Sequence, residues 1–135
     1  MRQSVEAVRA LIEREGLLFG TGAAWWREPR RPVPGDFDIA LDRSRVGTWI
    51  ERFFRAGLRV ERWQAPLHSP LNDGQLAGYF YVRVFPDPGP PLDLAFREEI
   101  KAPRGVGVAT REQVRRMKQA RGLERDIRWL ETAGL

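Results

Sequence analysis

Apolar residues recur at helical spacing in two long segments of the chain. The first runs from Gln3 to Glu15 and the second begins at Ser44, and each keeps its apolar residues on one face. A glycine suited to a C-terminal cap follows each segment, Gly16 and Gly57. We expect two amphipathic helices, the first closed by Gly16 in a left-handed conformation and the second packing its aromatic face on a sheet. The apolar positions are Val5, Val8, Leu11 and Ile12 in the first helix and Val46, Trp49, Ile50, Phe53 and Phe54 in the second.

Short apolar or alternating runs predict five strands. Residues 17–19 form an apolar run that enters a glycine-rich turn at residues 20–22, after which we expect a short helix. Residues 58–63 alternate with period two. The runs 76–85 and 92–96 are rich in aromatic and branched residues, and we expect them to pair as antiparallel strands. The remaining strand covers residues 36–41.

Two further helices are expected in the C-terminal part of the chain. Thr110 to Gln113 fits a capping box, which predicts a helix that carries Lys118 and ends or bends at Gly122. Residues 123–133 should form a final short helix with Ile127 and Leu130 on one side. This order of helices and strands implies a single domain over residues 1–135, with an α+β fold built on a mixed sheet flanked by helices.

Composition limits the kinds of function to consider. Hydrophobic residues make up 42% of the chain and charged residues 30%, and no apolar run is long enough to span a bilayer, so we expect a cytoplasmic protein with no membrane partner. The chain has no cysteine and one histidine, His68, which excludes a thiolate or His-rich metal site. Any metal should therefore be a hard cation on oxygen ligands.

Arginine dominates the positive charge. The net charge is +5, and Lys101 and Lys118 are the two lysines. A planar guanidinium can donate two hydrogen bonds to one phosphate, so a phosphorylated ligand or a nucleic-acid acceptor is plausible. Arg27, Arg30 and Arg31 could reach such a ligand, although a solvated arginine-rich surface explains the same composition.

Three aspartates are candidate metal ligands. On a strand, side chains two apart project to the same face, so Asp36 and Asp38 should stand side by side while the residues between them face the core. Repulsion between the two carboxylates is offset when a divalent cation bridges them. Asp93 lies in a neighbouring apolar strand and could supply a third ligand or act as a base. An Asp-x-Asp pair in an exposed strand, and a glycine turn made for tightness alone, are the simpler alternatives.

The combination resembles the nucleotidyltransferase superfamily, the polymerase-beta-like group. Its pattern of a hydrophobic-Gly-Gly/Ser turn followed by Asp-x-Asp/Glu is similar to residues 18–21 followed by residues 36–39. The segment 117–130, with Lys118 and the pair Arg125-Asp126, resembles the lysine-containing helix and Arg/Lys-Asp segment of small stand-alone members often encoded as antitoxins. Thr21 stands where glycine or serine is usual, and Trp129 where an acidic residue is frequent.

The resemblance implies Mg²⁺-dependent transfer of a nucleoside monophosphate from a nucleoside triphosphate, most readily ATP, to an acceptor hydroxyl on a protein, a nucleic acid or a small molecule. Gly20, Thr21 and Lys118 would bind the nucleotide. Asp36, Asp38 and Asp93 would hold the metal and carry catalysis, with Asp93 helping to activate the acceptor. The alternative that the resemblance implies is a non-catalytic antitoxin or regulatory module that docks on a partner toxin protein.

Overall fold

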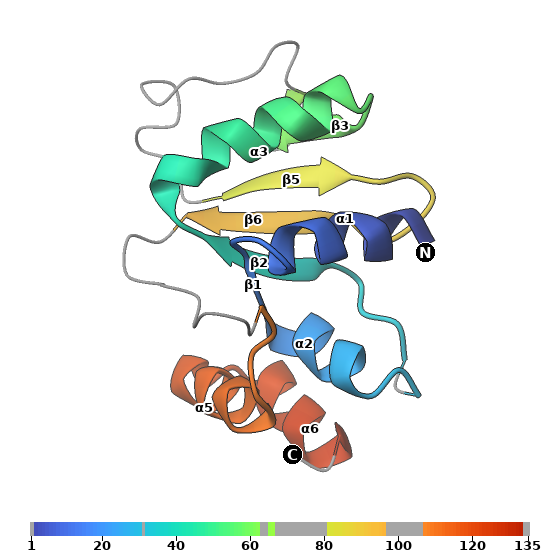
Figure 1. Ribbon diagram of the computed structural model, residues 1–135. Coiled ribbons are helices and arrows are strands. Elements are labelled where there is room, and N and C mark those ends of the chain that lie inside the picture. Colours follow the sequence, from blue (N-terminus) through green and yellow to red (C-terminus); the bar gives the residue numbers. More distant parts are fainter. Residues whose placement is uncertain (1, 31, 63–64, 67–80, 97–106, 134–135) are drawn as a thin grey trace.

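Six strands form one mixed sheet in the computed structural model, which describes residues 2–30, 32–62, 65–66, 81–96 and 107–133. The strand order is β1-β2-β6-β5-β3-β4 (Figure 1), with β2 and β6 parallel and every other pair of neighbours antiparallel. The protein thus has the expected α+β fold. Its elements are α1 (Arg2–Ile12), β1 (Leu17–Phe19), α2 (Gly20–Arg27), β2 (Phe37–Leu41), α3 (Arg43–Arg55), β3 (Arg59–Arg62), β4 (Ala65–Pro66), β5 (Tyr81–Phe85), β6 (Leu92–Phe96), α5 (Arg111–Arg121) and α6 (Glu124–Ala133).

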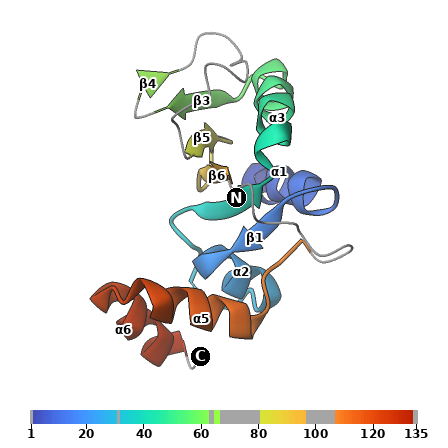
Figure 2. The ribbon, with the colours of Figure 1, turned by 90° about the vertical axis from the view of Figure 1, so that its left-hand side faces the viewer.

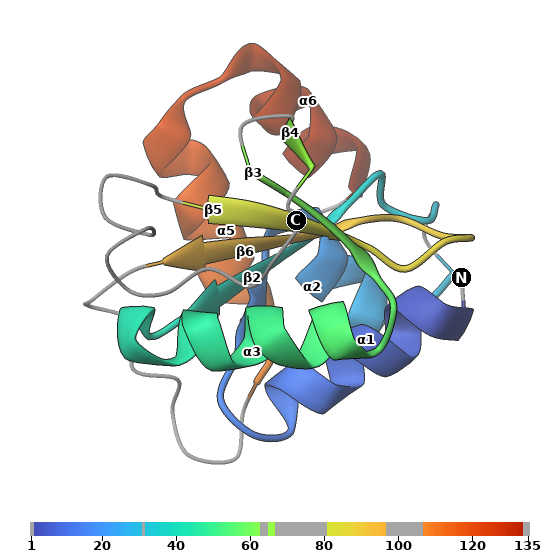
Figure 3. The same ribbon diagram turned by 90° about the horizontal axis from the view of Figure 1, so that it is seen from above.

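The helices divide into two groups around the sheet. Helices α1 and α3 lie together on one face, and α5 and α6 lie on the other side of the strands (Figure 3). Turned by 90° from the view of Figure 1, the molecule shows α2, α5 and α6 gathered beyond β1 (Figure 2). Helix α5 packs against both α2 and α6. The second group of helices therefore stands over one end of the open sheet face.

The core lies between the sheet and the first group of helices. Phe37, Ile39 and Leu41 of β2 are fully buried there, as the alternation in that strand predicted. Burying a large apolar side chain stabilises the fold by about 1.5–3 kcal/mol, so this alternation fixes which way β2 faces. The opposite face of β2 carries Asp38, which lines a cavity. Helices α1 and α3 contribute Val8, Leu11, Val46, Trp49, Ile50 and Phe53 to the same core.

Both predicted ends of α5, the capping box at its start and the glycine at its end, are present. The hydroxyl of Thr110 accepts a hydrogen bond from the backbone N–H of Gln113 at 3.1 Å, and the Gln113 side chain accepts one from the Thr110 N–H at 2.8 Å. Gly122 ends α5 in the left-handed conformation, with φ 64°. This turn brings α6 back against α5, so that side chains of the two helices meet.

The first helix ends earlier than expected. Helix α1 stops at Ile12, and Gly16 does not take the left-handed conformation that was predicted for it. A Cβ at Gly16 would lie 2.8 Å from Cγ2 of Ile39 and 3.3 Å from Cβ of Leu11. The glycine is therefore required by close packing of the α1–β1 turn on β2.

Most of the other predicted elements are confirmed, and some of the predicted residues lie outside the described ranges. Strands β3, β5 and β6 lie within the predicted runs, and β5 pairs with β6 antiparallel as expected. On α6, which forms where the final short helix was expected, Leu130 is buried and Ile127 is 43% exposed. No helix of the described ranges is long and apolar enough to cross a membrane. Outside the described residues lie Arg31 and residues 67–80, which include His68 and the first part of the predicted run 76–85.

Candidate active site

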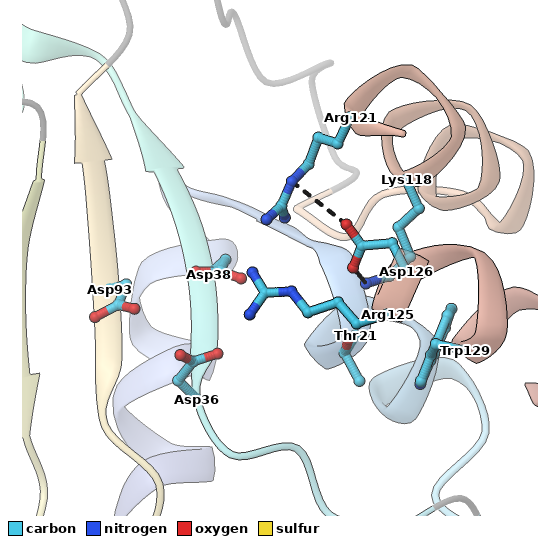
Figure 4. Close-up of a pocket in the computed structure, with 9 residues that line it drawn as sticks. All are labelled: Thr21, Asp36, Asp38, Asp93, Lys118, Arg121, Arg125, Asp126 and Trp129. Atoms are coloured by element: carbon cyan, nitrogen blue, oxygen red, sulfur yellow. Dashed lines mark hydrogen bonds and ion pairs between the residues drawn. The ribbon is translucent and has the colours of Figure 1, made fainter. Parts of the chain in front are cut away.

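Three carboxylates meet near the amino-terminal ends of two neighbouring parallel strands. Asp36 immediately precedes β2, Asp38 is the second residue of β2, and Asp93 is the second residue of β6. The parallel register pairs Asp38 directly with Asp93. One oxygen from each of the three side chains lies within 4.8 Å of the other two, a spacing that fits a single bound cation. Figure 4 shows all three lining the same cavity.

Burial and repulsion from neighbouring carboxylates make Asp36 and Asp38 reluctant to ionise. Desolvation, followed by the charges of Asp36 and Asp93, raises the pKa of Asp38 to about 6, against a lowering effect of Arg121 and Lys118. The pKa of Asp36 is also raised, mainly by desolvation and the charge of Asp93. A divalent cation would favour the ionised forms of both, so the donors fit a hard cation on chemical as well as geometric grounds.

Arg83 of β5 is bound to two of the three carboxylates. Its Nε donates to Oδ1 of Asp93 at 2.6 Å and its Nη2 to Oδ2 of Asp93 at 2.8 Å, which is a bidentate pair. Nη2 also donates to Oδ2 of Asp36 at 3.3 Å. Sequence reasoning missed this residue. The signal was a charged residue between the apolar Val82 and Val84, but its partner depends on strand register.

The glycine turn lies against the carboxylates. Gly20 has φ +67°, and a Cβ there would lie 3.3 Å from Oδ2 of Asp38. It is the first residue of α2, so the free backbone N–H groups of the first helical turn stand at the start of this helix. Thr21 follows and lines the cavity beside Asp36 and Asp38. The predicted turn and the predicted aspartates are thus brought together.

Basic side chains of α5 and α6 form the opposite wall of the cavity. Lys118 and Arg121 come from α5, and Arg125 comes from α6 (Figure 4). In Figure 4 the guanidinium of Arg125 extends from α6 towards the carboxylates. The cavity between the two walls measures about 440 Å³. It therefore combines an acidic side that suits a metal ion with a basic side that suits phosphate.

Asp126 organises this basic wall from within. It is buried, and one oxygen accepts a hydrogen bond from Nζ of Lys118 at 3.2 Å while the other lies 3.5 Å from Nε of Arg121. Nζ of Lys118 also stands 4.6 Å from the ring centre of Trp129, a cation–π contact. Lys118 is thus held at the cavity rather than exposed on the surface.

Arg27 and Arg30, also considered from the sequence, are not among the described residues that line the cavity. Arg27 ends α2, and its Nε and Nη2 donate to the backbone carbonyls of Ala109 and Val108, each at 2.8 Å. It therefore ties α2 to the segment that leads into α5, instead of reaching phosphate. Arg30 is exposed.

Fold and site together define an α+β domain with an acidic triad on the sheet and a basic wall of two helices. Comparison of the chain with protein-family models, with curated proteins and with solved structures found no match. The inference of function therefore depends on the residues of this cavity and on the sequence pattern described above.

Proposed function

We propose that the protein is a nucleotidyltransferase, which transfers a nucleoside monophosphate from a nucleoside triphosphate, most readily ATP, to an acceptor hydroxyl. One observation carries the proposal: three carboxylates with oxygens within 4.8 Å of one another face Lys118, Arg121 and Arg125 across one cavity. A metal-bound triphosphate needs both surfaces at once. The resemblance of residues 18–39 and 117–130 to the nucleotidyltransferase pattern gives independent support from the sequence.

Asp36, Asp38 and Asp93 would hold the cation, which we propose to be Mg²⁺. Their donor set is all oxygen, and Mg²⁺ commonly takes a few carboxylates plus substrate phosphates. Bound there, the cation would neutralise charge that develops on the transferred phosphoryl group. The carboxylates fix where this neutralisation takes place.

The triphosphate would lie between the start of α2 and the basic wall. Backbone N–H groups at a helix start favour a negative ligand, and Gly20 leaves room for one beside Asp38. The hydroxyl of Thr21 is a further donor at the same cavity. Lys118, Arg121 and Arg125 supply positive charge from the other side, and Asp126 keeps Lys118 and Arg121 in place.

In the proposed reaction the acceptor oxygen attacks the α-phosphorus. A bond forms between that oxygen and phosphorus, and the bond from phosphorus to the α,β-bridging oxygen breaks, so pyrophosphate leaves with the electron pair. The proton of the acceptor hydroxyl passes to the carboxylate of Asp93. Each oxygen of Asp93 accepts one hydrogen bond from Arg83 and keeps a further lone pair for this role.

The alternative is a regulatory module or antitoxin that uses the same fold without turnover and docks on a partner protein. A large exposed apolar surface would favour it. Among the described residues the exposed large apolar side chains are Val33, Leu123 and Ile127, of which the last two lie one turn apart at the start of α6. This small group does not decide between the two functions, so the experiment below includes both outcomes.

The test is to incubate the purified protein with each α-labelled nucleoside triphosphate and Mg²⁺, with and without cell lysate, and to measure binding and label transfer. We expect transfer by the wild type and a loss of at least about 10²-fold in the Asp36→Asn, Asp38→Asn variant, because preorganised charge stabilisation contributes on that order. Chelation of Mg²⁺ should abolish transfer in the same way.

Asp42→Asn is the matched control. Asp42 follows β2 and caps α3 through a hydrogen bond from the Ser44 N–H at 2.9 Å, and asparagine caps helices equally well. This variant should keep full transfer. Nucleotide binding without transfer would favour the regulatory module, and the absence of any nucleotide binding would contradict the nucleotidyltransferase.

A further inference from the structure

The guanidinium of Arg83 already occupies oxygens that a cation would use. Both oxygens of Asp93 accept from it, at 2.6 and 2.8 Å, and Oδ2 of Asp36 accepts from it at 3.3 Å. Metal ions and guanidinium groups compete for carboxylate lone pairs, and each oxygen offers two. A cation could share these oxygens with Arg83, but only against a positive charge in direct contact with its ligands.

The position of Arg83 is imposed by the sheet. Arg83 stands directly opposite Asp93 of β6 on one side and opposite Glu61 of β3 on the other. Its backbone is therefore fixed between two strands, and the bidentate pair with Asp93 fixes its side chain. The side chain of Asp93 is 15% exposed and that of Arg83 is 39% exposed, so solvent screens the pair only in part.

Charge accounts for the need for such a residue. Three carboxylates so close together repel one another, and this repulsion adds to desolvation in raising the pKa of Asp36 and of Asp38. Without a cation, Arg83 offsets part of this repulsion. With a cation, the same positive charge opposes binding. The positive charge of Arg83 therefore stabilises the carboxylates in the absence of a cation and weakens the binding of a cation.

We propose that Arg83 is a positioning residue that holds Asp93 and Asp36 in place before metal arrives and competes with the metal for their oxygens. This inference depends on the proposed function for the existence of the cation site, and it adds how tightly that site binds. A free divalent cation then binds weakly. Ligands from a bound triphosphate are needed to overcome the competition.

The experiment titrates the nucleotide-free protein with Mn²⁺ and follows the free-ion signal by electron paramagnetic resonance. We expect Arg83→Met to bind Mn²⁺ at least about ten-fold more tightly than the wild type, because an opposing unit charge is removed from contact with the ligands. Arg83→Lys keeps the charge without the bidentate geometry and should fall between the two. If the methionine variant does not fold, the lysine variant carries the test.

A second measurement separates positioning from mere structural support. Without metal, Arg83→Met should unfold at a lower temperature than the wild type, and saturating Mn²⁺ should restore more of its stability than it adds to the wild type. Arg59→Met is the matched control, because Arg59 forms an ion pair with Glu61 of its own strand, β3, instead of with the three aspartates. It should leave Mn²⁺ affinity unchanged.

The possible outcomes distinguish this inference from the proposed function. Equal or weaker Mn²⁺ binding by both Arg83 variants, with a wild type that does bind, would overturn the role of Arg83 and leave the proposed function standing. Binding by the variants with none by the wild type would support strong competition. Absence of Mn²⁺ binding in all proteins, Arg83→Met included, would also overturn the role of Arg83, because removing the competitor would then uncover no cation site. The proposed function is decided separately, by the label-transfer assay.

Discussion

The raised pKa of Asp38 links the stability of the protein to pH. A carboxyl whose folded-state pKa lies above its unfolded value holds its proton more tightly when folded. With a value of about 6 in the folded protein against 3.8 for the ordinary carboxyl, the stability contributed by the protonated form is complete below about pH 4 and is lost as pH rises to 6. Asp36 acts with the same sign. Metal should reverse the trend, because it binds the ionised forms.

We therefore expect the metal-free protein to lose up to about 3 kcal/mol of unfolding free energy between pH 4 and 6 through Asp38, from a shift of this size. Urea denaturation with a chelator present measures it. Asp38→Asn cannot ionise at this position and should show a smaller loss over the same range. A parallel pH dependence in the two proteins would contradict the assignment. Mn²⁺ affinity of the wild type should rise as pH increases through 6.

The sequence predicted the three carboxylates but not the residue that binds them. Asp36, Asp38 and Asp93 could be chosen because strand alternation puts charged residues on the face away from the apolar ones. Arg83 shows the same alternation in β5, but its role depends on pairing with Asp93, and strand register is set by the whole sheet. For the same reason Arg27 could not be assigned, since its acceptors belong to residues 108–109.

Helices α5 and α6 are joined by an ion pair that is almost fully buried. The side chains of Lys118 and Asp126 are 8% and 7% exposed. Removing one partner of such a pair leaves the other charge buried and uncompensated, which costs more than the pair itself contributes. The pair therefore matters for the position of the basic wall more than for net stability.

We expect Lys118→Met to lower the free energy of unfolding by about 3 kcal/mol. The double variant Lys118→Met, Asp126→Leu should lose less than the sum of the two single variants, because it leaves neither charge behind. Urea denaturation of the four proteins gives the coupling energy. Additive losses would show that the two side chains do not act as a pair.

Local signals predicted the elements well where they are self-contained. The capping box at Thr110, the glycine end at Gly122 and the apolar face of α3 were all found, because each depends on neighbouring residues. The end of α1 was misplaced, since Gly16 is required by contact with Ile39 across the fold. The parallel pairing of β2 with β6 also lies beyond local patterns, because three strands separate them along the chain.

The two walls of the cavity belong to different parts of the fold and are joined near Arg27. That residue holds the carbonyls of Val108 and Ala109 just before α5 begins, and Val108 forms a parallel bridge with Leu18 of β1. Loss of the Arg27 guanidinium would release the segment that leads into α5 from its contact with α2. The acidic wall, which is carried by β2 and β6, would not be affected.

Arg27→Met should therefore weaken binding of a fluorescent ATP analogue by about ten-fold, while Mn²⁺ affinity in the absence of nucleotide stays the same. We also expect a loss of stability of about 2 kcal/mol, because two hydrogen bonds from a charged group are removed. Arg30→Met, at an exposed position three residues further on, is the control and should change neither quantity. Equal effects on nucleotide and Mn²⁺ would contradict separate walls.

The parallel register of β2 and β6 also governs when the site can exist during folding. Asp38 and Asp93 become neighbours only when β6 pairs with β2, and α3, β3, β4 and β5 lie between these two strands along the chain. Closing so long a stretch of chain is entropically costly, and like charges add to that cost at the same step. A chain in which β6 is not yet paired with β2 lacks the full triad. If the proposed cation binds there, it is therefore a reporter of the finished sheet and favours that form over earlier ones.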